Sequence, residues 1–129
     1  MNKQIVSAFI DAVNAHDVAK IAGMLTDGHI FIDAHENHFQ GKEMMKEAWK
    51  MYFQNFPDYK IDPKEFFENG NTVIIVGHAS GTVAEHGSIN PHKHWKRPAV
   101  WKAIISNNLI QHWQVFTDTK IVFDLMEKK

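Results

Sequence analysis

The sequence contains no cysteine among its 129 residues. This absence excludes disulfide bonds, zinc–thiolate sites, iron–sulfur clusters and a cysteine nucleophile. The sequence also lacks an excess of basic residues, because 14 Lys and Arg stand against 15 Asp and Glu. Nucleic acids and anionic membrane surfaces attract strongly basic proteins, so we expect neither as a partner.

Long apolar runs are absent as well. No stretch approaches the roughly 18 apolar residues of a membrane span, and the first residues lead into an amphipathic pattern rather than a signal-peptide core. The hydrophobic share is 44% and the charged share 22%, as in an ordinary globular domain. We expect one cytoplasmic domain that spans residues 1–129.

Histidine and aromatic residues are what the sequence has in quantity. It contains nine His, four Trp and nine Phe. An aromatic load of this size suits a wide apolar pocket or an aromatic oligomer interface. A core that is simply rich in Phe explains it equally well, so composition alone leaves these alternatives open.

Hydrophobic spacing predicts three helices in the first half of the chain. Residues 5–13 carry apolar side chains at positions i, i+3, i+4, i+7 and i+8. Asp17 is a good N-cap for a second helix, which we expect to end at Thr26-Asp27-Gly28. A third helix runs from Lys42 to about Phe56, because the proline that follows disfavours the helical conformation before it.

Alternation of apolar and polar residues predicts strands in the rest of the chain. The expected strands are His29–His35 with a short return at 38–40, then residues 59–68, 72–83, about 95–106 and 109–119. The polar stretch 85–96 predicts a loop, and residues 120–129 predict a short tail with a helical turn. This order predicts an α+β fold with the helices on one face of one sheet.

Several motifs in this order resemble one family. They are Gly41-Lys42-Glu43 at the start of a helix, Phe56-Pro57-Asp58, Gly70-Asn71-Thr72-Val73, Gly81-Thr82 and the strand around Trp113. Together they resemble the SnoaL-like branch of the NTF2-like, or ketosteroid-isomerase-like, superfamily over nearly the whole chain. The Phe-Pro-Asp and Gly-Thr motifs are moderately specific, and the order of the others adds weight.

The resemblance implies a cone-shaped α+β barrel. Three N-terminal helices would pack on a strongly curved, mainly antiparallel sheet and enclose a pocket, and the outer sheet face would form a homodimer. Members of this superfamily include polyketide cyclases, isomerases, dehydratases and epoxide hydrolases, and many others are non-catalytic. The fold therefore leaves the function open.

Four residues are candidates for acid–base chemistry. Asp33 and His35 share the face of Phe31 on the expected strand, and an Asp/His pair is the smallest acid–base unit. His78 lies in the middle of a strand, where a histidine either packs or lines a pocket. The resemblance adds Asp118, because catalytic relatives carry an Asp near the end of this strand. The alternative for both aspartates is a solvated surface position.

The last strand has two sets of alternating residues, and only one set can face a pocket. We expect the set of Trp113, Val115 and Thr117 to face inward, since the set of His112, Gln114 and Phe116 is more polar and suits an interface. Asp118 then reaches the pocket only if a bulge intervenes. The expected apolar walls of the pocket are Phe31, Trp49, Phe53, Trp101 and Trp113.

Metal binding has weak support in the sequence. His35 and His38 with Glu36 lack a committed third ligand, and His92-Lys93-His94, with His86 nearby, lacks the glutamate of a cupin site. We therefore expect no metal and no cofactor. Arg97 and Lys102 are the nearest candidates for binding an anionic group, although a strand lysine more often covers apolar surface with its stem.

Two main hypotheses follow. The first is a cofactor-independent cyclase, isomerase or dehydratase that acts on a small apolar carbonyl compound. The second is a non-catalytic module that binds a small ligand or dimerises. A third, less supported hypothesis is a metal-dependent protein that uses the histidines.

Overall fold

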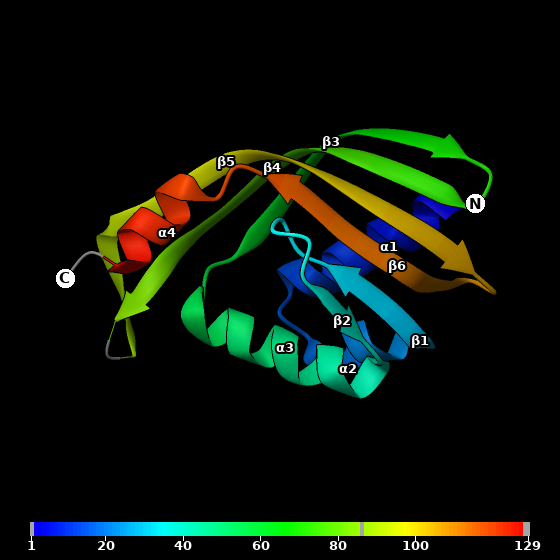
Figure 1. The fold of residues 1–129 in the computed structure, drawn as a ribbon, viewed down its shortest axis with the longest axis horizontal. Coiled ribbons are helices and arrows are strands. Elements are labelled where there is room, and N and C mark those ends of the chain that lie inside the picture. Colours follow the sequence, from blue (N-terminus) through cyan, green and yellow to red (C-terminus); the bar gives the residue numbers. More distant parts are fainter. Residues whose placement is uncertain (1, 86, 128–129) are drawn as a thin grey trace.

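The computed structural model describes residues 2–85 and 87–127. One sheet of six strands, in the order β2-β1-β6-β5-β4-β3, arches over the first three helices (Figure 1). The elements are α1 Asn2–Asn14, α2 Val18–Gly23, β1 Leu25–Ile32, β2 His38–Gln40, α3 Lys42–Asn55, β3 Lys60–Asn69, β4 Thr72–Glu85, β5 Ser88–Ser106, β6 Leu109–Thr117 and α4 Lys120–Glu127. This architecture confirms the predicted α+β fold.

The sheet is mixed. Its strands pair antiparallel except for β1 and β6, which run parallel. Alternation along β4 buries Val73, Ile75 and Ala79 on the concave face, whereas Ile74 and His78 remain half-exposed on the convex face. The core therefore lies between the concave face and the helices.

The helices contribute the other half of that core. The predicted apolar face of α1 is buried, and Phe9 packs against Trp113 of β6 with ring centroids 4.8 Å apart. On α3, Met45, Trp49 and Phe53 are buried at spacings of four residues. Among the described residues, no helix is long and apolar enough to cross a membrane.

The prediction that Thr26-Asp27-Gly28 ends the second helix is wrong. The helix ends at Gly23, and Leu25 already pairs with Ile110 of β6. The carbonyl of Met24 accepts a hydrogen bond of 2.8 Å from the backbone N–H of Ile110. Pairing with a strand that is distant in the sequence thus overrides the local turn signal.

The predicted loop at residues 85–96 is also wrong for the described residues. Strand β5 begins at Ser88, and its pairing with β4 includes Ala84 with Ile89 and Thr82 with His94. The stretch is polar because most of its side chains remain in solvent, although Lys93 is buried. His86 lies outside the described residues.

The C-terminal tail forms a complete helix rather than a single turn. Helix α4 lies at the end of the molecule opposite the start of α1, close to the C-terminal end of β4 and the N-terminal end of β5 (Figure 1). None of its side chains is fully buried. The helix therefore packs on the rest of the domain through side chains that remain partly exposed.

Candidate active site

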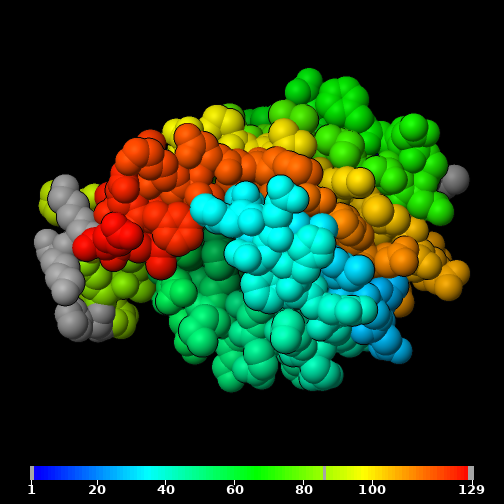
Figure 2. Space-filling view, viewed as in Figure 1, coloured from blue at the N-terminus to red at the C-terminus, as the bar shows by residue number. Residues whose placement is uncertain are grey.

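A cavity of about 380 Å³ lies between α3, the turn after β1, α4 and the concave face of the sheet. In the space-filling view, α4 (red) meets the residues that follow β1 (cyan) above α3 (green) (Figure 2). The volume of this cavity falls in the range of small-molecule sites. The lining residues are Phe31, Asp33, Ala34, His35, Phe39, Met45, Ala48, Trp49, Tyr52, Asn55, Phe56, Tyr59, Ala79, Trp95, Arg97, Trp101, Trp113, Val115, Thr117, Asp118, Thr119, Val122, Phe123 and Met126.

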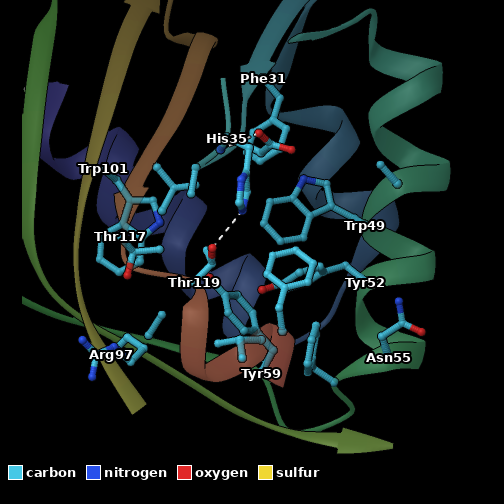
Figure 3. Close-up of a pocket in the computed structure, with 18 of the residues that line it drawn as sticks. Phe31, His35, Trp49, Tyr52, Asn55, Tyr59, Arg97, Trp101, Thr117 and Thr119 are labelled. Atoms are coloured by element: carbon cyan, nitrogen blue, oxygen red, sulfur yellow. Dashed lines mark hydrogen bonds between the residues drawn. The ribbon is translucent and has the colours of Figure 1, made fainter. Parts of the chain in front are cut away.

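Aromatic rings form a large part of the wall. Trp49 and Tyr52 extend from α3 on one side, and Trp101 lies on the opposite side (Figure 3). The rings of Trp101 and Trp113 stack with centroids 6.4 Å apart, and those of Trp49 and Tyr52 meet nearly at right angles. Such a wall favours flat or aliphatic apolar groups over polar ones.

Two tyrosines bring hydroxyl groups to this wall. The rings of Tyr52 and Tyr59 pack edge to face with centroids 4.8 Å apart. Burial raises the pKa of Tyr52 and of Tyr59 well above the usual value for a tyrosine. Both hydroxyls stay protonated near neutral pH, so they can donate a hydrogen bond but cannot act as bases.

His35 lies in the turn that follows β1 and not, as predicted, on the strand itself. Its Nε2 lies 2.8 Å from Oγ1 of Thr119, at the start of α4 (Figure 3). The His35 ring also meets the Phe123 ring edge-on at 5.3 Å. The hydrogen bond with Thr119, just before α4, and the ring contact with Phe123 of α4 therefore fix the imidazole at the cavity wall.

Asp33 lines the same cavity but no hydrogen bond joins it to the His35 ring. Its carboxylate accepts hydrogen bonds from the backbone N–H groups of His35 and Asn37, both at 2.9 Å, and from the Asn37 amide at 3.0 Å. Partial burial raises the pKa of Asp33, but these hydrogen bonds outweigh it and hold the pKa below its usual value. Asp33 is thus an ionised residue that shapes the turn.

Asp118 reaches the rim of the cavity because the chain leaves β6 after Thr117. Strand alternation no longer governs its direction, so no bulge is needed. Its Oδ1 accepts a hydrogen bond of 2.9 Å from the backbone N–H of Lys120 at the start of α4. The carboxylate is exposed.

Two of the predicted site residues lie elsewhere. His78 faces the convex side of the sheet, opposite Asp62 and Pro98 on the neighbouring strands. Phe53 is buried behind the wall, where its ring stacks on His16 at 4.0 Å. We do not retain either as a site residue. The structure brings Asp33, His35 and Asp118 to one cavity with Phe31, Trp49, Trp101 and Trp113.

Several lining residues were not identified as site residues from the sequence. Tyr52 lies one turn after Trp49 on the same apolar face of α3, and that spacing was a usable signal. Thr119 and Asn55 carry no such signal, because only the fold brings them to the cavity. No group of three or more His, Asp or Glu among the described residues is arranged to hold a metal ion.

Comparisons with known proteins agree with this fold. A protein of ketosteroid isomerase-like fold from Catenulispora acidiphila, in complex with trimethylamine, is 14% identical with a TM-score of 0.82, over 94% of this chain and 90% of that one. An NTF2-like protein from Burkholderia thailandensis is 21% identical with a TM-score of 0.82, over 99% and 98%.

A candidate SnoaL-like polyketide cyclase from Shewanella putrefaciens is 16% identical with a TM-score of 0.83, over 97% of this chain and 95% of that one. At these identities the likeness concerns the fold alone. No curated protein matches the chain significantly. A family model described as a SnoaL-like domain matches residues 6–123, which is most of the sequence, and the chain therefore belongs to the SnoaL-like domain family.

Proposed function

We propose that this protein binds a small, largely apolar carbonyl compound in the cavity and that His35 moves a proton on it. The reaction would be of the cyclase, isomerase or dehydratase type and would need no cofactor. The observation that carries the proposal is the position of the His35 ring, held by Thr119 at the wall of an aromatic cavity. Histidine is the side chain best suited to exchange protons near neutral pH.

The other candidate groups are less suited to this role. Asp33 stays ionised because its oxygens accept three hydrogen bonds within its turn. Tyr52 and Tyr59 stay protonated. These groups can orient a substrate or donate a hydrogen bond, and Asp118 at the rim can assist His35.

Two relatives support the proposal in general terms. The Shewanella putrefaciens protein is described as a candidate polyketide cyclase. The Catenulispora acidiphila protein was solved with trimethylamine, a small molecule. These names concern those proteins, and they make a small-molecule pocket the reasonable starting point for this one.

The test begins with a screen of small cyclic and aryl ketones and enones for binding and turnover. For a compound that turns over, we expect His35→Gln to lower kcat by about 100-fold or more, as expected for loss of a general acid–base group. His92→Gln is the matched control, because His92 is exposed on β5 and does not line the cavity. Unchanged turnover in the His35 variant would remove the proposed role.

We also propose that the convex face of the sheet forms a homodimer. Phe116 is 49% exposed there, opposite the half-buried Val100 of β5, which in turn pairs with the half-buried Val76 of β4. Exposed aromatic residues in an apolar patch favour an interface. Phe116→Lys is expected to yield a monomer in light scattering, whereas Met51→Lys, at a position on α3 that is 60% exposed, should leave the dimer intact. A monomeric wild type would contradict the proposal.

A further inference from the structure

We propose that the cavity contains a subsite for an anionic oxygen, formed by Trp95 and Arg97 of β5, so that the preferred ligand is an apolar compound with a carboxylate or enolate. This inference rests on the proposed function, since it names the ligand class for the same cavity. Trp95 and Arg97 are separated by one residue on β5, and both line the cavity. Alternation along a strand places such residues on one face.

Both residues carry a buried donor that lacks a partner. Trp95 is 5% exposed, and its indole Nε1 makes no hydrogen bond with any described residue. The Nε of Arg97 is also buried without a partner among the described residues. Buried polar groups in native proteins nearly always have partners. Neither nitrogen has surface open to the cavity in this structure, so an acceptor supplied by a ligand would meet these two donors after the side chains of Trp95 and Arg97 turn toward it.

Arg97 also has an unbalanced charge. It is the one Lys or Arg among the described lining residues, and it forms no ion pair with any described residue. The residue is half-exposed although its Nε is buried, so part of the guanidinium remains accessible. A guanidinium binds carboxylate oxygens through paired, charge-assisted hydrogen bonds.

The other charged groups of the cavity favour one orientation of an anionic ligand. Asp33 and Asp118 lie with His35 in the segments just after β1 and β6, and their carboxylates would repel an anion there. Figure 3 places His35 and Arg97 well apart, on opposite sides of the labelled group. An anionic oxygen held by Trp95 and Arg97 would leave the apolar body of the ligand across the aromatic wall, within reach of His35.

The matched probes for this subsite are 1-naphthaleneacetate and its neutral carboxamide, measured by calorimetry on the whole chain. The two molecules have nearly the same shape and differ in the charge of the acceptor group. We expect wild type to bind the acid about tenfold more tightly than the amide, as for a charge-assisted hydrogen-bonded pair. The indole N–H signal of Trp95 in NMR spectra should shift when the acid binds.

Three variants separate the local contact from general charge. Arg97→Gln should reduce the preference for the acid to about twofold or less, since it removes the ion pair. Trp95→Phe keeps an aromatic ring against Phe56 but removes the donor, and should weaken acid binding by about threefold to tenfold. Lys102→Gln removes the same charge from the opposite face of β5, and the preference should persist.

The outcomes distinguish the subsite from the proposed function. Equal binding of the acid and the amide to wild type would overturn the subsite and leave the apolar pocket intact. Loss of the preference in Lys102→Gln to the same extent as in Arg97→Gln would also overturn it, because a long-range charge effect would then explain the preference. Failure of both probes to bind would overturn the subsite together with the apolar binding that the proposed function requires.

Discussion

The carboxylate of Asp58 accepts two hydrogen bonds from a single residue, Thr82. The backbone N–H of Thr82 donates to Oδ1 at 2.7 Å, and the Thr82 hydroxyl donates to Oδ2 at 2.6 Å. Because the hydroxyl proton points to Asp58, its oxygen is free to accept from Nδ1 of His94, at 2.8 Å. This pair ties the segment after α3 to β4, beside the cavity wall formed by Phe56 and Tyr59.

The first prediction concerns this pair. Thr82→Val removes the hydroxyl donor and leaves one oxygen of Asp58 without its partner, so the free energy of unfolding should fall by about 1–3 kcal/mol. Thr82→Ser keeps the hydroxyl and loses one methyl group, so it should cost about 1 kcal/mol or less. Urea unfolding of both variants measures the difference. Equal losses would show that the hydrogen bond contributes little.

The same pair illustrates how far sequence reasoning reached. Phe56-Pro57-Asp58 and Gly81-Thr82 were identified as family motifs, but nothing in their spacing indicated that they touch. Their contact requires β4 to lie next to the end of α3, which only the assembled sheet provides. The order of helices and strands, by contrast, follows from local periodicity, and local patterns predicted it well.

Errors of prediction arose where distant segments decide local structure. The turn signal at Thr26-Asp27-Gly28 yields to parallel pairing with β6, which cannot be seen from neighbouring residues. Asp33 and His35 were expected on a strand face, but hydrogen bonds from Asn37 and the His35 backbone fold them into a turn. The partner of the His35 ring, Thr119, lies 84 residues away.

The second prediction concerns Gly77, at the register shift between β3 and β4. A Cβ atom at this position would lie 2.2 Å from the backbone oxygen of Asp62 and 3.0 Å from the Cα of Pro63. Backbone atoms cannot rotate away, so Gly77→Ala should lower the free energy of unfolding by about 3 kcal/mol or more. Chemical denaturation, with soluble yield as a second measure, tests this.

Gly28→Ala is the matched control for that substitution. Gly28 also lies within a strand, but no atom lies within 4 Å of its added Cβ. Its unfolding free energy should change by about 1 kcal/mol at most. If Gly77→Ala proves as stable as Gly28→Ala, the close approach of β3 at Gly77 is incorrect.

The third prediction concerns the attachment of α4. The hydrogen bond between His35 and Thr119 joins this helix to the turn after β1. His35→Ala and Thr119→Val should each speed amide hydrogen exchange in residues 121–127. The loss of local stability in the double variant should be smaller than the sum of the two single losses by about 0.5–1.5 kcal/mol, because both substitutions remove the same hydrogen bond.

A control for this cycle is available on α4 itself. Lys120→Ala removes the exposed pair of Lys120 with Asp124, whose atoms are 2.8 Å apart. This substitution does not involve His35, so its effect should add to that of His35→Ala. Additive behaviour of Thr119→Val as well would contradict the described hydrogen bond.

The last prediction concerns His29, a buried residue that no proposed activity uses. It is 1% exposed, and its Nδ1 lies 2.8 Å from the carbonyl oxygen of Ile110, so Nδ1 carries the hydrogen. Burial lowers the pKa of His29 below the usual 6.5, although the bond to Ile110 raises it somewhat and His112 lowers it further. An NMR titration should give a midpoint below 6.5 for this ring.

The sign of the effect on stability follows from that shift. Above pH 6.5 the histidine is neutral in both folded and unfolded chains, and the stabilisation is complete. As the pH falls below 6.5, His29 becomes protonated in the unfolded chain but stays neutral in the folded chain, so the free energy of unfolding declines until the pH passes the folded pKa.

His29→Asn keeps an N–H donor that does not titrate. The free energy of unfolding of this variant should therefore vary less between pH 7.5 and pH 5.5, roughly the range over which histidine titrates. His92→Asn, at an exposed position, should retain the wild-type dependence on pH, and an unchanged dependence in His29→Asn would show that His29 is not the group responsible.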